Sequence, residues 1–273
     1  VDRITSLNDV PREPLVPRRL GKNMCVPFGK ILRGKVVPNT VTKTLHTDKV
    51  YEPDLNSFTI EPFPYYSPLK SQIETIKSFD RPVILVDDLV HKADRLQVLV
   101  PQFREDGIPI RKVVVGVLSG YGRDLMQCLK VPVESIYSMP NLRQWFVEST
   151  LYPFIGGDTV RREEMKVAGL QPSINMILPY ATPRLSGCSR EALVEFSACC
   201  IENSRDLLQV LEAGYRKQYA KNLTLSRLSE AVILPLCPDK GSCMEYDENL
   251  AASVYLENDL ETLWRMKEFM IKG

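Results

Sequence analysis

Two adjacent acids, Asp87 and Asp88, directly follow the short apolar run Val83–Val86. A continuous apolar run of this length predicts a strand buried on both faces, as in a parallel sheet covered by helices. A helical pattern from about Asp94 to Asp106 and a second apolar run within Arg111–Ser119 come next. Strand, helix and strand in this order predict a parallel βαβ unit with a right-handed crossover.

The segments around this unit contain further strand and helix patterns. Before the βαβ unit, the predicted elements are an extended Pro-rich arm (1–30), a strand or strand-loop (30–37), a strand (40–51), a hairpin (51–63) and a helix begun by Ser67 and Pro68. After it, they are a short helix to Lys130, a strand (133–137) and a helix from Pro140. These patterns predict the α/β class with a mainly parallel sheet.

The C-terminal part has a different character. A long helical pattern runs from Ser189 to about Asn222, and a last helix is predicted to start at Asn258. The predicted apolar side of the long helix holds Leu193, Phe196, Cys200, Leu207, Val210, Leu211 and Tyr215. We therefore expect an α/β domain over residues 1–180 and a mainly helical extension over residues 181–273.

The composition argues against several classes of protein. With 35 basic and 34 acidic residues the net charge is +1, so we expect no nucleic-acid partner. No apolar run approaches the roughly 20 residues of a membrane span, so we expect no membrane partner. Seven cysteines without a C-x-x-C motif favour reduced thiols in a cytoplasmic protein, and the segment between Cys237 and Cys243 is expected to be a simple turn. The chain starts at Val1 rather than at Met, which indicates a processed chain or a piece of a longer protein.

The position of the two acids predicts a ligand site. Open α/β sheets bind ligands at the carboxyl ends of their strands, which is where Asp87 and Asp88 are expected. The helix that follows offers unpaired N–H groups to a phosphate, and Lys92 and Arg95 add positive charge. Carboxylates can accept hydrogen bonds from the hydroxyls of a sugar. The alternative is that both acids only cap the next helix and are solvated.

The segment Val-Ile-Leu-Val-Asp-Asp-Leu-Val, followed by a turn and a helix, resembles the phosphoribosyl-pyrophosphate (PRPP) motif of type I phosphoribosyltransferases. The resemblance implies that family's sheet with a small hood, and catalytic contacts of Asp87 and Asp88 with ribose. It also implies a loop that binds the 5′-phosphate, formed by His91, Lys92, Ala93, Asp94 and Arg95. A pyrophosphate loop would be formed by Arg33, Gly34 and Lys35. Tyr65 or Phe154 would stack a base, and Mg²⁺ would bind with PRPP. Where the family carries Thr-Thr-Gly-x-Thr, this chain has His-Lys-Ala-Asp-Arg.

Two functions follow from the resemblance. One is a phosphoribosyltransferase that uses PRPP and Mg²⁺; the other is a non-catalytic domain that binds a nucleotide, a sugar phosphate or another domain of a longer chain. The chain also resembles, more weakly, the C-terminal region of bacterial multidomain proteins described as cytidylyltransferase-related. A response-regulator receiver is disfavoured because it requires an Asp three residues before Met139-Pro140, where this chain has Ile136. A homodimer is left open.

Overall fold

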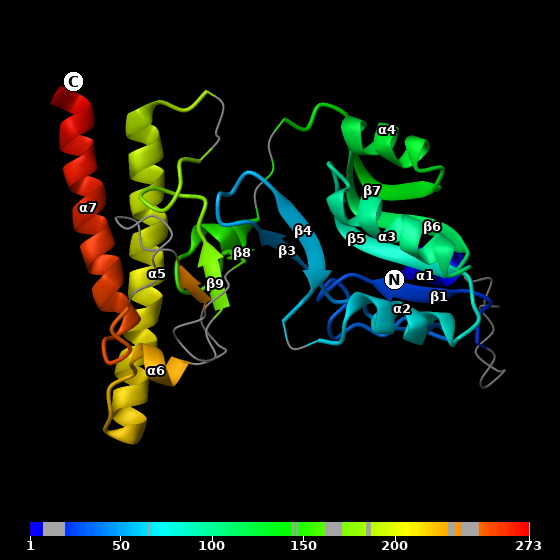
Figure 1. Ribbon diagram of the computed structural model, residues 1–273, viewed down its shortest axis with the longest axis horizontal. Coiled ribbons are helices and arrows are strands. Elements are labelled where there is room, and N and C mark those ends of the chain that lie inside the picture. Colours follow the sequence, from blue (N-terminus) through cyan, green and yellow to red (C-terminus); the bar gives the residue numbers. More distant parts are fainter. Residues whose placement is uncertain are drawn as a thin grey trace. The chain divides into compact units, whose positions relative to one another are not determined.

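The computed structural model describes residues 1–7, 20–64, 66–143, 145, 147–161, 171–183, 187–228, 233–235 and 246–272. The chain divides into two compact units (Figure 1). Unit 1 holds residues 1–48 and 60–143, and unit 2 holds residues 49–59 and 144–273. Along the chain, the last change from unit 1 to unit 2 falls between residues 143 and 144, and the domain boundary expected near residue 180 stays a prediction.

Unit 1 is built on a five-stranded sheet in which all neighbouring strands run parallel. Its strands are β1 (Met24–Pro27), β2 (Val41–Thr42), β5 (Val83–Val90), β6 (Ile110–Ser119) and β7 (Val133–Met139), in the spatial order β2-β1-β5-β6-β7. The prediction of an α/β fold with a mainly parallel sheet is confirmed.

Helices cover the two faces of this sheet unequally. The longer helices α2 (Leu69–Lys77), α3 (Asp94–Glu105) and α4 (Gly120–Cys128) pack on one face through the main apolar core. The short helix α1 (Asp2–Leu7) and apolar residues of the 31–37 segment cover the other. Right-handed crossovers explain this division. The chain moves in one direction from β1 to β2 and in the opposite direction from β2 through β5 and β6 to β7, so the two sets of connections lie on opposite faces.

Three local predictions for unit 1 are wrong. The 30–37 segment forms turns rather than a strand, with Gly34 at a φ of 72°. Ser67 is not the N-cap of α2; the cap position is Pro68, and the carbonyl of Ser67 accepts a hydrogen bond from the side chain of Gln72. Pro140 follows β7 in a turn, and it begins no helix in the part of the segment that the structure describes.

A second sheet contains β3 (Thr47–Tyr51), β4 (Phe58–Pro62), β8 (Asp158–Val160), β9 (Gln171–Ile174) and β10 (Ile233–Pro235) in the order β10-β9-β8-β3-β4. β3 and β4 form the predicted hairpin around a turn at residues 53–57. The 3₁₀ helix Glu148–Leu151 precedes β8. β3 and β8 are parallel, whereas β8 and β9 are antiparallel, so this sheet is mixed.

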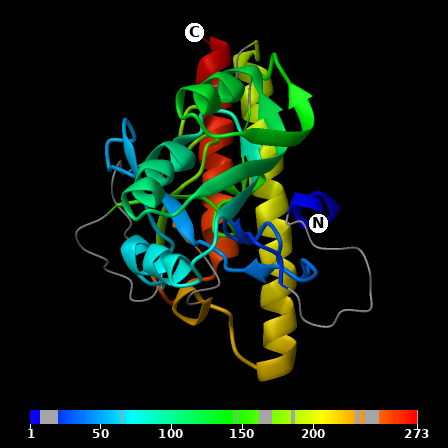
Figure 2. The same cartoon turned by 90° about the vertical axis from the view of Figure 1, so that its right-hand side faces the viewer.

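Two long helices dominate unit 2. α5 (Arg190–Tyr219) and α7 (Ala252–Lys272) pack side by side, and the four-residue helix α6 (Leu225–Leu228) lies between them in the chain (Figures 1 and 2). Glu212 bonds to Ser253 near the start of α7, and Glu195 pairs with Lys267 near its end, so the two helices are antiparallel.

The predicted start of α5 is confirmed, but its predicted apolar side is partly wrong. Ser189 caps the helix by accepting a hydrogen bond from the amide of Ala192 at 3.1 Å. Leu207, Val210 and Leu211, which were expected in the core, are exposed. The core face is instead formed by Val194, Ser197, Ala198, Cys200, Ile201, Ser204 and Leu208. The last helix begins at Ala252, six residues before the expected Asn258.

Several sequence predictions fall outside the described residues. They concern residues 8–19 of the Pro-rich arm, Tyr65, and the segment from Cys237 to Cys243. In its described part the extended arm expected over residues 1–30 is wrong, because residues 2–7 form α1 and residues 24–27 form the buried strand β1. Among the helices that the structure describes, none combines the length and apolarity needed to cross a membrane.

Candidate functional site

The strand order of the first sheet reverses between β1 and β5. From β1 the chain continues to β2 on one side, and from β5 it continues to β6 on the other. In open α/β sheets such a switch point opens a crevice at the carboxyl ends of the two central strands, and ligands bind there. The loop after β1 and the turn after β5 both begin at this edge, so the topology brings the two predicted phosphate-binding segments to one place.

Asp87 and Asp88 lie inside β5 and not after it, because the strand runs on to Val90. The pairing of β5 with β1 ends at Pro27↔Val86, whereas its pairing with β6 continues to Val90. The two acids therefore occupy the stretch of β5 that extends past β1. Asp87 is 7% exposed, and Asp88 is exposed to solvent.

Asp87 is joined to Arg95 in the first turn of α3. Nη1 of Arg95 donates to both carboxylate oxygens of Asp87, at 3.1 and 3.2 Å. The same guanidinium lies 5.1 Å from the centre of the ring of Phe28, the residue after β1. Burial raises the pKa of Asp87 to about 7, because the loss of hydration outweighs the attraction of Arg95. This cluster fastens the start of α3 to the ends of β1 and β5.

The turn after β5 holds His91, Lys92 and Ala93, and α3 begins at Asp94. Ala93 has a φ of 55° and a ψ of 25°, the left-handed conformation that glycine adopts most easily. The chain therefore adopts with an alanine a backbone geometry that glycine takes without strain, at a cost of roughly 1 kcal/mol. Ala93 offers no side-chain cap to the first turn of α3. Lys92 is exposed beside it.

The loop after β1 contains the other predicted phosphate-binding residues. Arg33, Gly34 and Lys35 are exposed in consecutive turns, closed by hydrogen bonds from the amides of Arg33 and Lys35 to the carbonyls of Lys30 and Leu32. The loop therefore exposes two cationic side chains, Arg33 and Lys35, in the connection between β1 and β2.

Ser119, at the end of β6, is a residue that the sequence predictions missed. Its side chain is fully buried, accepts a hydrogen bond from the amide of Gly122 at 2.9 Å, and lies 2.8 Å from Nδ1 of His91. The hydroxyl therefore caps α4 and also fixes the ring of His91, whose centre lies 5.9 Å from that of Tyr121. The available signal was a serine between a buried strand and Gly-Tyr-Gly, which is typical of an N-cap.

Gly122 is required where α4 approaches the end of β5. A Cβ added there would lie 2.2 Å from the carbonyl oxygen of Val90. The backbone of α4 thus packs directly on β5 at the same edge of the sheet, next to His91.

The prediction that Phe154 stacks a base is wrong. The side chain is fully buried in the core of unit 2 and contacts the rings of Tyr246 and Tyr255. It has no exposed face for a ligand. The other candidate, Tyr65, lies outside the described residues.

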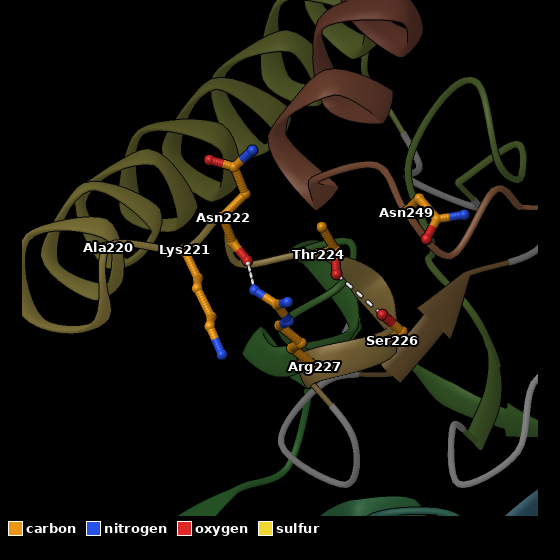
Figure 3. A pocket seen from close by; sticks show the side chains of 7 residues that line it. All are labelled: Ala220, Lys221, Asn222, Thr224, Ser226, Arg227 and Asn249. Atoms are coloured by element: carbon orange, nitrogen blue, oxygen red, sulfur yellow. Dashed lines mark hydrogen bonds between the residues drawn. The ribbon is translucent and has the colours of Figure 1, made fainter.

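A separate pocket of about 420 Å³ lies at the C-terminal end of α5 (Figure 3). Its lining consists of Ala220, Lys221, Asn222, Thr224, Ser226, Arg227 and Asn249. Arg227 already donates to the carbonyl of Asn222 at 2.7 Å, and the hydroxyls of Thr224 and Ser226 lie 2.9 Å apart. A helix C-terminus also disfavours anions, so the two cations here do not form a strong anion site.

Within the part of the chain that the structure describes, no group of three or more His, Cys, Asp or Glu side chains is placed to hold a metal ion. At the crevice, β5 exposes the carboxylate of Asp88, whereas that of Asp87 is bonded to Arg95. Mg²⁺ would therefore fit this edge as part of a bound diphosphate rather than as an ion held by the protein alone.

Neither a scan against protein-family models nor a search of curated proteins finds a match to this chain. The candidate site therefore rests on the sheet topology and on the side chains described above.

Proposed function

We propose that this chain binds a phosphorylated small molecule, a nucleotide or a sugar phosphate, in the crevice between the carboxyl ends of β1 and β5. The observation that supports the proposal is the reversal of strand order at this point. The connections after β1 and after β5, which contain the 33–35 loop and the 91–95 turn, both leave the sheet at its carboxyl edge. Both segments expose cations there, Arg33 and Lys35 on one side and Lys92 on the other.

Each group at the edge then has a distinct role. The first amides of α3 and the ammonium of Lys92 hold a terminal phosphate, since a helix N-terminus favours a negative charge. The exposed carboxylate of Asp88 accepts hydrogen bonds from sugar hydroxyls. Arg33 and Lys35 neutralise a second phosphate when the ligand has one.

Asp87 and Arg95 act differently from the roles that the family resemblance implies. Because they are bonded to each other, they position the 91–95 turn and do not contact the ligand. A site that binds its ligand without group transfer fits this pairing, since one carboxylate remains for the sugar. We therefore favour a binding module, of the kind that serves other domains of a longer protein.

Phosphoribosyl transfer is the second candidate, and the resemblance of the 83–90 segment to the PRPP motif supports it. In that case Mg²⁺ would supply charge neutralisation for the diphosphate leaving group. The protein would contribute orientation of the sugar through Asp88 and a phosphate anchor at the start of α3.

Calorimetric titration distinguishes these functions. Nucleoside monophosphates, and PRPP with Mg²⁺, are titrated into the wild type and into Asp88→Asn and Lys92→Gln. Each substitution is expected to weaken binding about tenfold or more, since a hydrogen bond to a charged group contributes about 1.5–3 kcal/mol. Turnover of PRPP with added bases would support transfer, and binding without turnover would support the module.

Matched control variants are available at Lys77, the last residue of α2, and Asp106, the C-cap of α3. Lys77 and Asp106 form an exposed pair at 3.9 Å, so Lys77→Gln and Asp106→Asn make the same chemical changes away from the crevice. They are expected to leave the dissociation constant unchanged. If a folded sample binds none of the ligands, or if the controls weaken binding as much as Asp88→Asn, the proposal is wrong.

A further inference from the structure

α5 carries a second apolar face, which is exposed in the part of the chain that the structure describes. Val210 is 70% exposed, Leu211 50% and Leu207 48%. With Gly214 they occupy positions i, i+3, i+4 and i+7, which lie on one side of a helix. We refer to Leu207, Val210, Leu211 and Gly214 as the α5 stripe.

The α5 stripe is separate from the contact of α5 with α7. Gln209 and Glu212 reach α7 through bonds to Glu257 and Ser253. At 100° per residue, these two side chains leave the helix on the side away from the α5 stripe. The α5 stripe is therefore not the edge of the contact between α5 and α7.

Gly214 gives an independent indication of a close approach from outside. A glycine in the interior of a helix costs about 1 kcal/mol relative to alanine. Here no described residue lies within 4 Å of an added Cβ, and the residue has ordinary helical backbone, so no contact among the described residues requires a glycine. A missing side chain at this position would serve a helix that packs against the α5 stripe.

The α5 stripe is complementary to a second copy of itself. If two α5 helices pack antiparallel about a two-fold axis between Val210 and Leu211, Leu207 of each copy faces Gly214 of the other. The large side chain then meets the smallest one, while Val210 and Leu211 meet at the centre. An isologous contact requires this symmetry, in which the same patch serves both copies.

The charges beside the α5 stripe favour the same arrangement. Asp206 and Lys217 lie on one flank of the helix, and the antiparallel arrangement brings Asp206 of each copy near Lys217 of the other. Arg205 bonds to Oδ1 of Asp206, so Oδ2 is the oxygen that this lysine would meet. Exposed pairs contribute only about 0.2–1 kcal/mol each, so they set the orientation more than the affinity. In a parallel arrangement, the flank that carries Asp206 and Lys217 would instead face the opposite flank of the partner helix, and the charge pairing would be lost.

From this symmetry, the charge pairing and the unexplained glycine, we propose that the α5 stripe is a dimer interface in which α5 packs antiparallel against α5 of a second copy. The partner is the same chain rather than another protein, because both halves of the complementary pattern are present on one helix.

Sedimentation velocity over a range of concentrations tests the proposal with the full chain. The wild type is expected to approach twice the 31.0 kDa of one chain. Val210→Glu places two carboxylates at the centre of the symmetric contact and is expected to weaken the dimer at least tenfold. Ile136→Glu is the matched control, because Ile136 in β7 is 74% exposed and lies outside α5; this variant should dimerise like the wild type.

Two further variants separate dimerisation from folding. Gly214→Leu fills open space in one copy, so its thermal stability as a monomer should be unchanged or higher while the dimer is lost. Asp206→Lys or Lys217→Asp alone should weaken the dimer, and the double substitution should restore it. A wild type that stays monomeric at every concentration, a Val210→Glu variant that still dimerises, or a double substitution that fails to restore the dimer would overturn the proposal.

Discussion

The Asp87→Asn substitution tests whether burial outweighs the ion pair with Arg95. Asp87 has a pKa of about 7 in the folded chain, against 3.8 as its ordinary value. A carboxyl with a raised folded-state pKa stabilises the fold below its unfolded pKa, and this contribution is lost as the pH rises through the folded pKa. At roughly 1.4 kcal/mol per pH unit, the whole effect is about 4 kcal/mol, with about 3 kcal/mol between pH 4.5 and pH 7.5.

The wild type should therefore lose about 3 kcal/mol of unfolding free energy, relative to Asp87→Asn, between those two pH values. Urea unfolding followed by circular dichroism measures this difference. Carbon-13 NMR of the carboxyl groups gives an independent value, because the resonance of Asp87 is the one that disappears in Asp87→Asn. Its midpoint should lie near pH 7.

Asp124→Asn is the matched control, since it removes an exposed carboxylate of α4 that is not among the groups that shift the pKa of Asp87. It should leave the pH dependence that Asp87 contributes unchanged. A carboxyl midpoint below about pH 4, together with a stability of the wild type that rises with pH relative to Asp87→Asn, would refute the reasoning. Arg95 would then outweigh burial, and Asp87 would be ionised at every pH of the fold.

Two further predictions concern the packing of unit 1. Gly122→Ala should destabilise the fold by about 1–3 kcal/mol or more in a thermal or urea unfolding experiment, because its Cβ would overlap the carbonyl of Val90. The thiol of Cys25 is fully buried, and burial raises its pKa to about 12. At pH 8 its thiolate fraction is therefore on the order of a thousandfold lower than that of an ordinary thiol. After labelling with a thiol reagent, mass spectrometry should find Cys25 unmodified and the exposed Cys128 modified.

The βαβ unit could be predicted closely from the sequence because its signals are local. The helix expected from Asp94 to Asp106 is found at Asp94–Glu105, and the strand expected within Arg111–Ser119 is found at Ile110–Ser119. The end of β5 could not be predicted in the same way. Two charges interrupt the apolar run, but the backbone continues to pair with β6 as far as Val90.

The features of the site that the sequence did not predict are contacts between residues that are far apart in the sequence. His91 and Ser119 lie 28 positions apart, and only the adjacent strand ends bring them together. Asp87 and Arg95 are both visible as candidate ligand contacts, but their mutual bond depends on α3 turning back over β5. For α5, the apolar pattern contains two stripes, and the sequence does not specify which one faces the core.

The pairing of Asp87 with Arg95 also bears on which of the two proposed functions the site performs. Threonines in the 91–95 turn would hold a phosphate by hydroxyl contacts, whereas Arg95 here bonds to a carboxylate of β5 and lies over Phe28 at the end of β1. The first acid of the segment thus holds the turn in place, and the second is exposed to solvent. The property that separates a binding module from a transferase at this site is therefore the partner of Asp87, not the presence of the two acids.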